Sequence, residues 1–150
     1  MKNLNYKKIA FTFSLIILVG LIVISIQGIF VSGPLRKQEQ DEANIHKKIQ
    51  KDQTCSQINR ISFKFVTYTC EETKQYVIYD ENAKKIATRK KSEAQFSKVK
   101  EIVNEYQKFK DAQIQVGYGY EAPAYYIAKD IDSLVIDFDT LEVIYSSGGK

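Results

Sequence analysis

The chain has 150 residues, enough for one ordinary domain or two very small ones, and a formal net charge of +4. Residues 1–8 carry three lysines and no acid, whereas the residues from 32 onward carry 19 basic against 18 acidic groups. The positive balance therefore belongs mainly to the N-terminus, and it argues against a nucleic-acid partner.

An uncharged run of 23 residues occupies positions 9–31, and 17 of them are Ile, Leu, Val, Phe or Ala. A helix needs about 20 apolar residues to cross a bilayer, so the run predicts one transmembrane helix. Positive residues stay in the cytoplasm, which predicts a cytoplasmic tail over 1–8 and an extracytoplasmic location for the rest. The alternative is a cleaved signal peptide, whose apolar core is shorter, about 7 to 15 residues.

Residues 32–53 form a polar, helix-compatible stretch, and we expect a stalk helix with one narrow buried face. Residues 54–91 are predicted to form a first sheet. Its strands are expected over 58–69, 76–79 and 85–88, where apolar and β-branched residues dominate, with a turn over 81–84.

Residues 92–150 are predicted to form a second unit, a helix followed by a sheet. Ser92 and Gln95 have the spacing of a capping box. An apolar stripe follows at helical spacing: Phe96, Val99, Ile102, Val103, Tyr106 and Phe109. Strands are expected over 114–120, 124–128, 134–138 and 143–145. The order predicts an α+β protein with antiparallel sheets and helices packed on one face.

An internal repeat supports two copies of one small unit. Residues 77–88 align with residues 135–146 without a gap, and each segment is interpreted as a strand, an acidic turn and a strand. All β-hairpins share features of this kind, so the similarity alone does not prove duplication.

Two cysteines, Cys55 and Cys70, lie in the extracytoplasmic part, where oxidation is permitted. One straight strand over 58–69 would hold them too far apart for a disulfide, since a strand rises about 3.3 Å per residue. A fold-back near residues 59–62 would bring them together. Neither their spacing nor their number indicates a metal site.

The layout resembles the TseB-like (YpmB-like) family, membrane-anchored regulators of cell wall elongation in Gram-positive bacteria built from two tandem PepSY-like units. The similarity runs from the Lys-bearing N-terminus and apolar run, through the polar stalk and the strands at 63–68 and 76–79, to the ending at 134–145. That ending is similar to the PepSY pattern Asp-x-x-Thr-Gly-x-Val, with Thr140 present and Leu141 replacing the glycine. Glycine takes a positive φ without penalty, so the turn is expected to differ.

The resemblance implies a non-enzymatic module that binds a wall-synthesis protein such as a penicillin-binding protein. Other PepSY-like domains imply the alternative of a peptidase-inhibitor or secretion-assisting module. A third hypothesis is a structural subunit of an envelope assembly.

The residues offer little for catalysis. His46 is the sole histidine, is expected to be exposed on the stalk, and has no partners for a zinc site or a hydrolase triad. Asp130, Asp132, Asp137 and Asp139 form two Asp-x-Asp pairs, but without EF-hand spacing they are expected to be solvated. No enzyme activity, cofactor or metal is expected.

Two surfaces are candidates for contact. The first is a basic cluster of Lys84, Lys85, Arg89, Lys90 and Lys91, which could meet an anionic wall polymer or lipid head groups or be merely solvated. Residues 36–110 carry 17 basic against 11 acidic groups, and residues 111–150 carry 2 against 7, which predicts a dipolar domain.

The second candidate is a tyrosine-rich segment, proposed to contact a partner through Tyr118, Tyr120, Tyr125 and Tyr126. Tyrosine combines a large apolar face with a polar tip and is favoured at interfaces. About half of these rings are expected to face the core.

Overall fold

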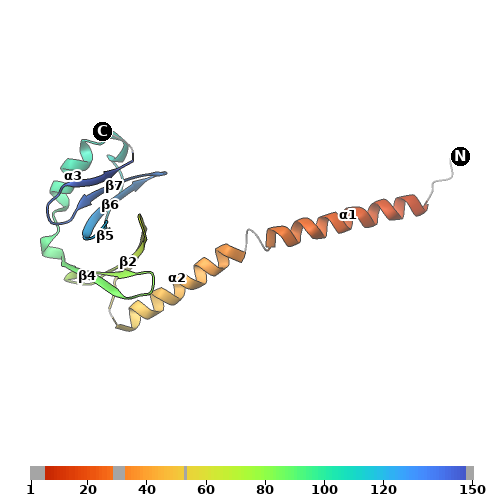
Figure 1. The fold of residues 1–150 in the computed structure, drawn as a ribbon, viewed down its shortest axis with the longest axis horizontal. Coiled ribbons are helices and arrows are strands. Elements are labelled where there is room, and N and C mark those ends of the chain that lie inside the picture. Colours follow the sequence, from red (N-terminus) through yellow and green to blue (C-terminus); the bar gives the residue numbers. More distant parts are fainter. Residues whose placement is uncertain (1–5, 29–32, 53, 148–150) are drawn as a thin grey trace. The chain divides into compact units, whose positions relative to one another are not determined.

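The structure, a computed structural model, describes residues 6–28, 33–52 and 54–147 (Figure 1). The chain divides into two compact units, Met1–Asn44 and Ile45–Lys150. In the first unit, helix α1 spans Tyr6–Gln27, and its segment Ala10–Gln27 is long and apolar enough to cross a membrane. Residues 1–5 of the predicted tail and 29–31 of the predicted span lie outside the described residues.

Helix α2 spans Gly33–Asp52, which confirms the predicted polar helix. Its last turns, from Ile45, belong to the second unit. Ile49 is 1% exposed and Ile45 packs beside it, so the buried face is narrow as expected. His46 was expected to be exposed, and this is wrong. Its ring meets the edge of Tyr68 at 5.7 Å between centroids, because it lies next to the buried stripe of the helix.

The first sheet has the antiparallel order β1-β2-β3-β4, with β1 at Gln57–Ser62, β2 at Val66–Glu71, β3 at Gln75–Asp80 and β4 at Lys85–Lys90. Its core against α2 is small. The buried members are Ile49, Tyr68, Cys70, Val77 and Tyr79.

A single strand over 58–69 was predicted, and this is wrong because the chain turns back at residues 63–65. The fold-back pairs Ile58 with Cys70. Cys70 thereby comes within 5.3 Å of Cys55, Cα to Cα, and the two form a disulfide. Of the two alternatives left open by the sequence, the fold-back is correct, although the turn comes after residue 62 rather than within 59–62.

Three short elements follow β4 in the chain and precede the second sheet. They are the 3₁₀ turn η2 at Lys91–Glu93, helix α3 at Phe96–Asn104 and the 3₁₀ turn η3 at Gln107–Phe109. The predicted helix start at Ser92 is wrong, because Ser92 belongs to η2 and the N-cap position of α3 is Gln95. The Gln95 N–H donates to the hydroxyl oxygen of Tyr125 at 2.7 Å, so a tertiary contact replaces the predicted capping box.

The second sheet has the antiparallel order β5-β6-β7-β8, with β5 at Ile114–Tyr118, β6 at Pro123–Lys129, β7 at Asp132–Asp137 and β8 at Val143–Ser146. Together with the first sheet it confirms the α+β class and most of the predicted strands. Its larger core against α3 includes Val99, Val103, Phe109, Tyr125, Ile127, Leu134, Ile136 and Phe138. Tyr76 of β3 also belongs to this core, which ties the two halves together.

The β3–β4 and β7–β8 hairpins share one plan, but the predicted gap-free alignment is wrong by one residue. Tyr79 pairs with Lys85, and Ile136 pairs with Val143. The first strands are thus offset by 57 residues and the second strands by 58, so the second turn is one residue longer. Each turn contains one residue with a positive φ near its end, Ala83 at 62° and Leu141 at 63°. Leu141 adopts this conformation although it replaces the glycine of the PepSY pattern. Each half therefore consists of a helix followed by a four-stranded antiparallel sheet.

The two sheets meet where β5 lies against strands of the first sheet. Gly117 on β5 permits this approach, since a Cβ built there would lie 2.4 Å from the Cδ1 of Ile61. Ile61 is 2% exposed, so the contact is fully packed. Figure 1 shows β5, β6 and β7 beside α3, and β2 and β4 beside the end of α2.

Candidate interaction surface

Four aromatic rings gather beside the β1–β2 turn: Phe63, Tyr120, Tyr126 and Tyr145. We call this group the aromatic surface. The Phe63 ring is at its centre, 5.3 Å from Tyr120, 6.3 Å from Tyr126 and 5.0 Å from Tyr145 between centroids. The rings meet edge to face or tilted, which is the favourable geometry for aromatic pairs.

Strand register explains why these tyrosines share a face. Tyr126 pairs with Val135, and Val135 pairs with Tyr145, so the three side chains lie in one row across the second sheet. This face is opposite to the one that carries Tyr125, because neighbouring residues on a strand point to opposite sides. The Tyr126 hydroxyl also donates to the carbonyl of Ser62 at 3.4 Å, which fixes the turn over the sheet.

The outer rings remain accessible. Tyr120 is 43% exposed and Tyr145 is 37% exposed. The Lys64 ammonium lies 5.1 Å from the centre of the Tyr120 ring, which adds a positive charge to the rim. Beside it, Phe65 is 39% exposed and contacts the Tyr118 ring at 5.8 Å. Half-exposed aromatic rings with a charged rim are typical of protein-binding surfaces.

The four predicted tyrosines separate in the structure. Tyr120 and Tyr126 belong to the aromatic surface, and Tyr118 lies next to it. Tyr125 is fully buried and stacks on Phe138 at 4.9 Å between centroids, so it is a core residue and not a contact residue. Burial raises the pKa of the Tyr125 hydroxyl above its usual value, although the hydrogen bond from the Gln95 backbone opposes this.

Phe63 and Tyr145 were missed by the sequence reasoning. Phe63 was assigned to a strand interior, and Tyr145 was treated as an ordinary strand residue. No local signal joins them, because they are brought together by the docking of one sheet on the other.

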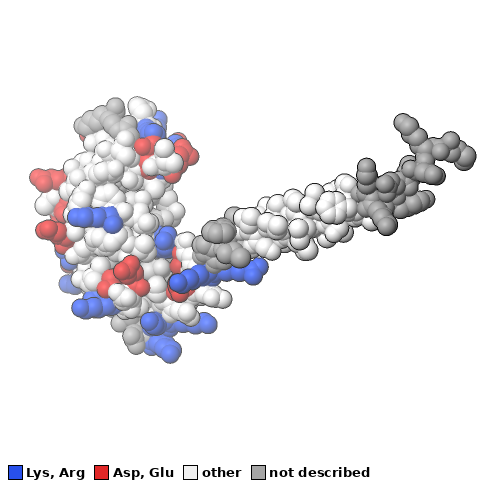
Figure 2. Space-filling model, turned by 45° about the vertical axis from the view of Figure 1, so that its right-hand side comes forward, with Lys and Arg blue, Asp and Glu red and all other residues white. Residues whose placement is uncertain are grey.

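The predicted basic cluster does not form one patch. Lys84 and Lys85 lie at the start of β4, and Lys90 and Lys91 at its end, about 16 Å away at the usual rise of a strand. Between them, Arg89 is engaged by Asp139, and this hydrogen bond raises the pKa of the guanidinium above its usual value. In Figure 2, lysine and arginine side chains gather over the lower part of the domain, where Figure 1 shows β4 and the end of α2.

The predicted aspartate pairs serve the structure of the turns. Asp137 accepts hydrogen bonds from the N–H groups of Asp139 and Thr140, at 2.9 and 2.8 Å. Asp132 forms an ion pair with Lys108. Over residues 6–28, 33–52 and 54–147, no group of three or more His, Cys, Asp or Glu side chains is placed to hold a metal ion.

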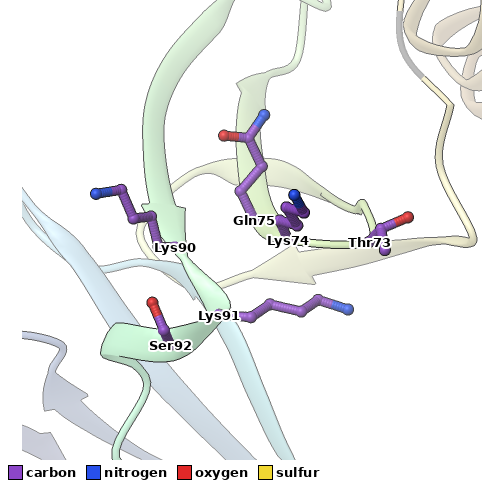
Figure 3. A pocket seen from close by; sticks show the side chains of 6 residues that line it. All are labelled: Thr73, Lys74, Gln75, Lys90, Lys91 and Ser92. Atoms are coloured by element: carbon purple, nitrogen blue, oxygen red, sulfur yellow. The ribbon is translucent and has the colours of Figure 1, made fainter.

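An open pocket of about 560 Å³ lies at the β2–β3 turn (Figure 3). It is lined by Thr73, Lys74, Gln75, Lys90, Lys91 and Ser92. Lys90 and Lys91, from one end of the predicted basic cluster, thus line the same pocket as Lys74 from the β2–β3 turn.

Comparisons with known proteins add no relative. No family model matches the chain, and neither the curated proteins nor the solved structures include a significant match. The resemblance to TseB-like proteins and to PepSY-like units therefore stays a prediction from the sequence layout.

Proposed function

We propose that this chain is a single-pass membrane protein whose extracytoplasmic domain binds an envelope protein and thereby regulates cell wall synthesis. The aromatic surface is the observation that carries the proposal. It offers exposed Tyr120 and Tyr145 rings on a rigid two-sheet scaffold, which is the composition expected of a binding site for a protein.

Two further features support the proposal. Helix α1 suits a membrane anchor, and the lysines that precede the apolar run favour a cytoplasmic N-terminus. The resemblance to TseB-like regulators implies a wall-synthesis enzyme, such as a penicillin-binding protein, as the partner.

Site-specific photocrosslinking in Gram-positive cells tests this proposal. A benzophenone amino acid replaces Tyr120 or Tyr145 in separate variants of the full chain. The matched control places it at Ile131, which is 97% exposed on the β6–β7 turn. We expect the two aromatic positions to crosslink a wall-synthesis enzyme and Ile131 not to do so.

The affinity of the chain for the captured enzyme provides a quantitative check. Tyr120→Ala is expected to weaken binding of the captured enzyme about tenfold, as truncation of an exposed aromatic anchor does at other interfaces. Crosslinks to a secreted protease alone would favour the peptidase-inhibitor alternative. Equal crosslinking from Ile131 and Tyr120 would contradict the aromatic surface as the binding site.

A further inference from the structure

We propose that the pocket at the β2–β3 turn binds the phosphate group of a phosphate ester or phosphodiester. This inference goes beyond the proposed function, because it concerns a charged non-protein ligand and a site built from other residues than the aromatic surface. The volume of about 560 Å³ lies within the range of small-molecule sites, about 300 to 1,000 Å³.

The walls of the pocket come from two segments that a backbone contact holds together. The Lys91 N–H donates to the carbonyl of Lys74 at 2.8 Å, and Gln75 pairs with Lys90 across the β3–β4 ladder. The Gln75 amide in turn donates to the Glu72 carboxylate at 2.6 Å. In Figure 3 the Gln75 side chain lies between those of Lys74 and Lys90, and the Lys90 ammonium points to the side away from Lys74. The lysines are therefore positioned by ordered backbone and not by a loose loop.

The polar groups of the lining carry more hydrogen-bond donors than acceptors, set in a largely apolar wall. Three ammonium groups, two hydroxyls and one amide line the pocket, and none of the carboxylates in the described part of the chain does so. Lysine ammonium groups bind phosphate as point charges, and hydroxyl groups donate to the remaining phosphate oxygens. Glu71, Glu72 and Glu93 each contact one lining side chain from outside the pocket, but the lining itself carries three ammonium groups, which repel a cation and favour an anion.

The three lysines differ in how free they are. Lys91 is held by Glu71 at 3.4 Å and lies 5.2 Å from the centre of the Tyr76 ring. The Lys90 ammonium lies 3.8 Å from the Glu93 carboxylate, which is long for an ion pair. Both side chains are at least half exposed, so this pair is weak. Lys74 has no carboxylate partner among the described residues. Lys74 and Lys90 are thus the two ammonium groups available to a ligand.

The body of the ligand follows from the lysine side chains. Their methylene stems form apolar walls beneath the charged heads. A phosphate attached to a polyol or a sugar would place its charge at the rim and its carbon skeleton on these stems. Outside a Gram-positive cell such groups occur in anionic wall polymers and in phospholipid head groups.

Binding measurements on the full chain in a neutral detergent test the inference. Isothermal titration with soluble poly(glycerol phosphate) represents the polymer. Dihexanoyl phosphatidylglycerol represents the head group, with dihexanoyl phosphatidylcholine as the zwitterionic control. We expect the wild-type chain to bind at least one of the two anionic probes and not the control, and the probe that binds identifies the source.

The decisive comparison uses two double variants with the same change in net charge. Lys74→Gln/Lys90→Gln is expected to lower affinity about tenfold or more, because it removes both available ammonium groups. Lys84→Gln/Lys85→Gln, at the opposite end of β4, is expected to leave affinity unchanged. Both pairs are exposed, and thermal unfolding checks that each variant folds. Equal losses in the two variants, or no binding of either anionic probe by the wild-type chain, would overturn the inference.

Discussion

Arg89 and Asp139 join the two halves of the domain through a pair of hydrogen bonds. The guanidinium Nη2 donates to Oδ2 at 2.7 Å, and Nε donates to Oδ1 at 3.3 Å. Arg89 is the last residue but one of β4 in the first sheet, and Asp139 follows β7 in the second half. A two-point contact between residues 50 positions apart fixes orientation as well as distance.

Breaking this two-point contact, or fork, should cost little stability, but the effects of substituting Arg89 and Asp139 should be coupled, that is, not additive. The side chains of Arg89 and Asp139 are 28% and 57% exposed, and exposed ion pairs contribute about 0.2 to 1 kcal/mol. Arg89→Lys keeps the charge but loses the planar fork, so we expect a loss near that of Arg89→Gln. Urea unfolding of each single variant and of the double variant with Asp139→Asn gives the coupling energy. A coupling energy of zero would show that the fork is merely a surface contact.

The Cys55–Cys70 disulfide should contribute much more. It closes a loop of 15 residues and fastens the chain after α2 to the small first core. The chain-entropy relation gives about 3 kcal/mol for a loop of this length. We expect reductant to lower the free energy of unfolding by about that amount in guanidinium titrations. The control is Cys55→Ala/Cys70→Ala, whose stability should not respond to reductant.

Gly117 should be required for the docking of the two sheets. An added Cβ would meet the Cδ1 of Ile61, which is buried and cannot move away freely. Overpacking of this kind costs about 1 to 3 kcal/mol, so we expect such a loss in Gly117→Ala.

Ile61→Val supplies the matched rescue for that variant, because valine lacks the Cδ1 atom. Alone it should cost about 0.5 to 1.5 kcal/mol for the lost methyl group. Combined with Gly117→Ala it should cost less than the sum of the single effects, as measured by urea unfolding. Additive effects would mean that the two residues do not share one contact.

The sequence revealed those elements whose signal is local. The alternation in β5, the apolar segments of β6 to β8 and the apolar run of α1 were sufficient to predict these elements. The predicted stripe marked Val99 and Val103 of α3 and the buried Tyr106 and Phe109 beyond its end, whereas Phe96 is 37% exposed. The fold-back was left as one of two alternatives, and its turn at residues 63–65 was misplaced, because Ile61, Phe63 and Phe65 alternate as in one strand. Alternation does not report where a chain turns without glycine or proline.

The candidate sites depended on tertiary contacts that no local pattern contains. Tyr125 and Tyr126 look alike in sequence, but alternation on β6 buries one ring and brings the other to the aromatic surface. The sequence does not contain the register of the sheet relative to the helix, and this register decides which of two neighbouring residues is buried. In the same way, Lys74 joins Lys90 only because β3 and β4 pair.

The Lys108–Asp132 pair should make stability depend on pH at the acid end. Hydrogen bonds from Lys108 and then from Ser147 lower the pKa of Asp132 below its usual value. A carboxyl group with a lowered pKa in the folded state stabilises the fold above its unfolded pKa, about 4, and loses this contribution as the pH falls further. We therefore expect Asp132→Asn to be less stable than the wild-type chain at pH 7, with the difference shrinking towards pH 3.

Urea unfolding at several pH values measures this difference in the free energy of unfolding. For Lys108→Gln the difference from the wild-type chain should shrink in the same way, because this substitution removes the other partner. A difference that stayed constant between pH 7 and pH 3 would contradict the assignment of the lowered pKa to this pair.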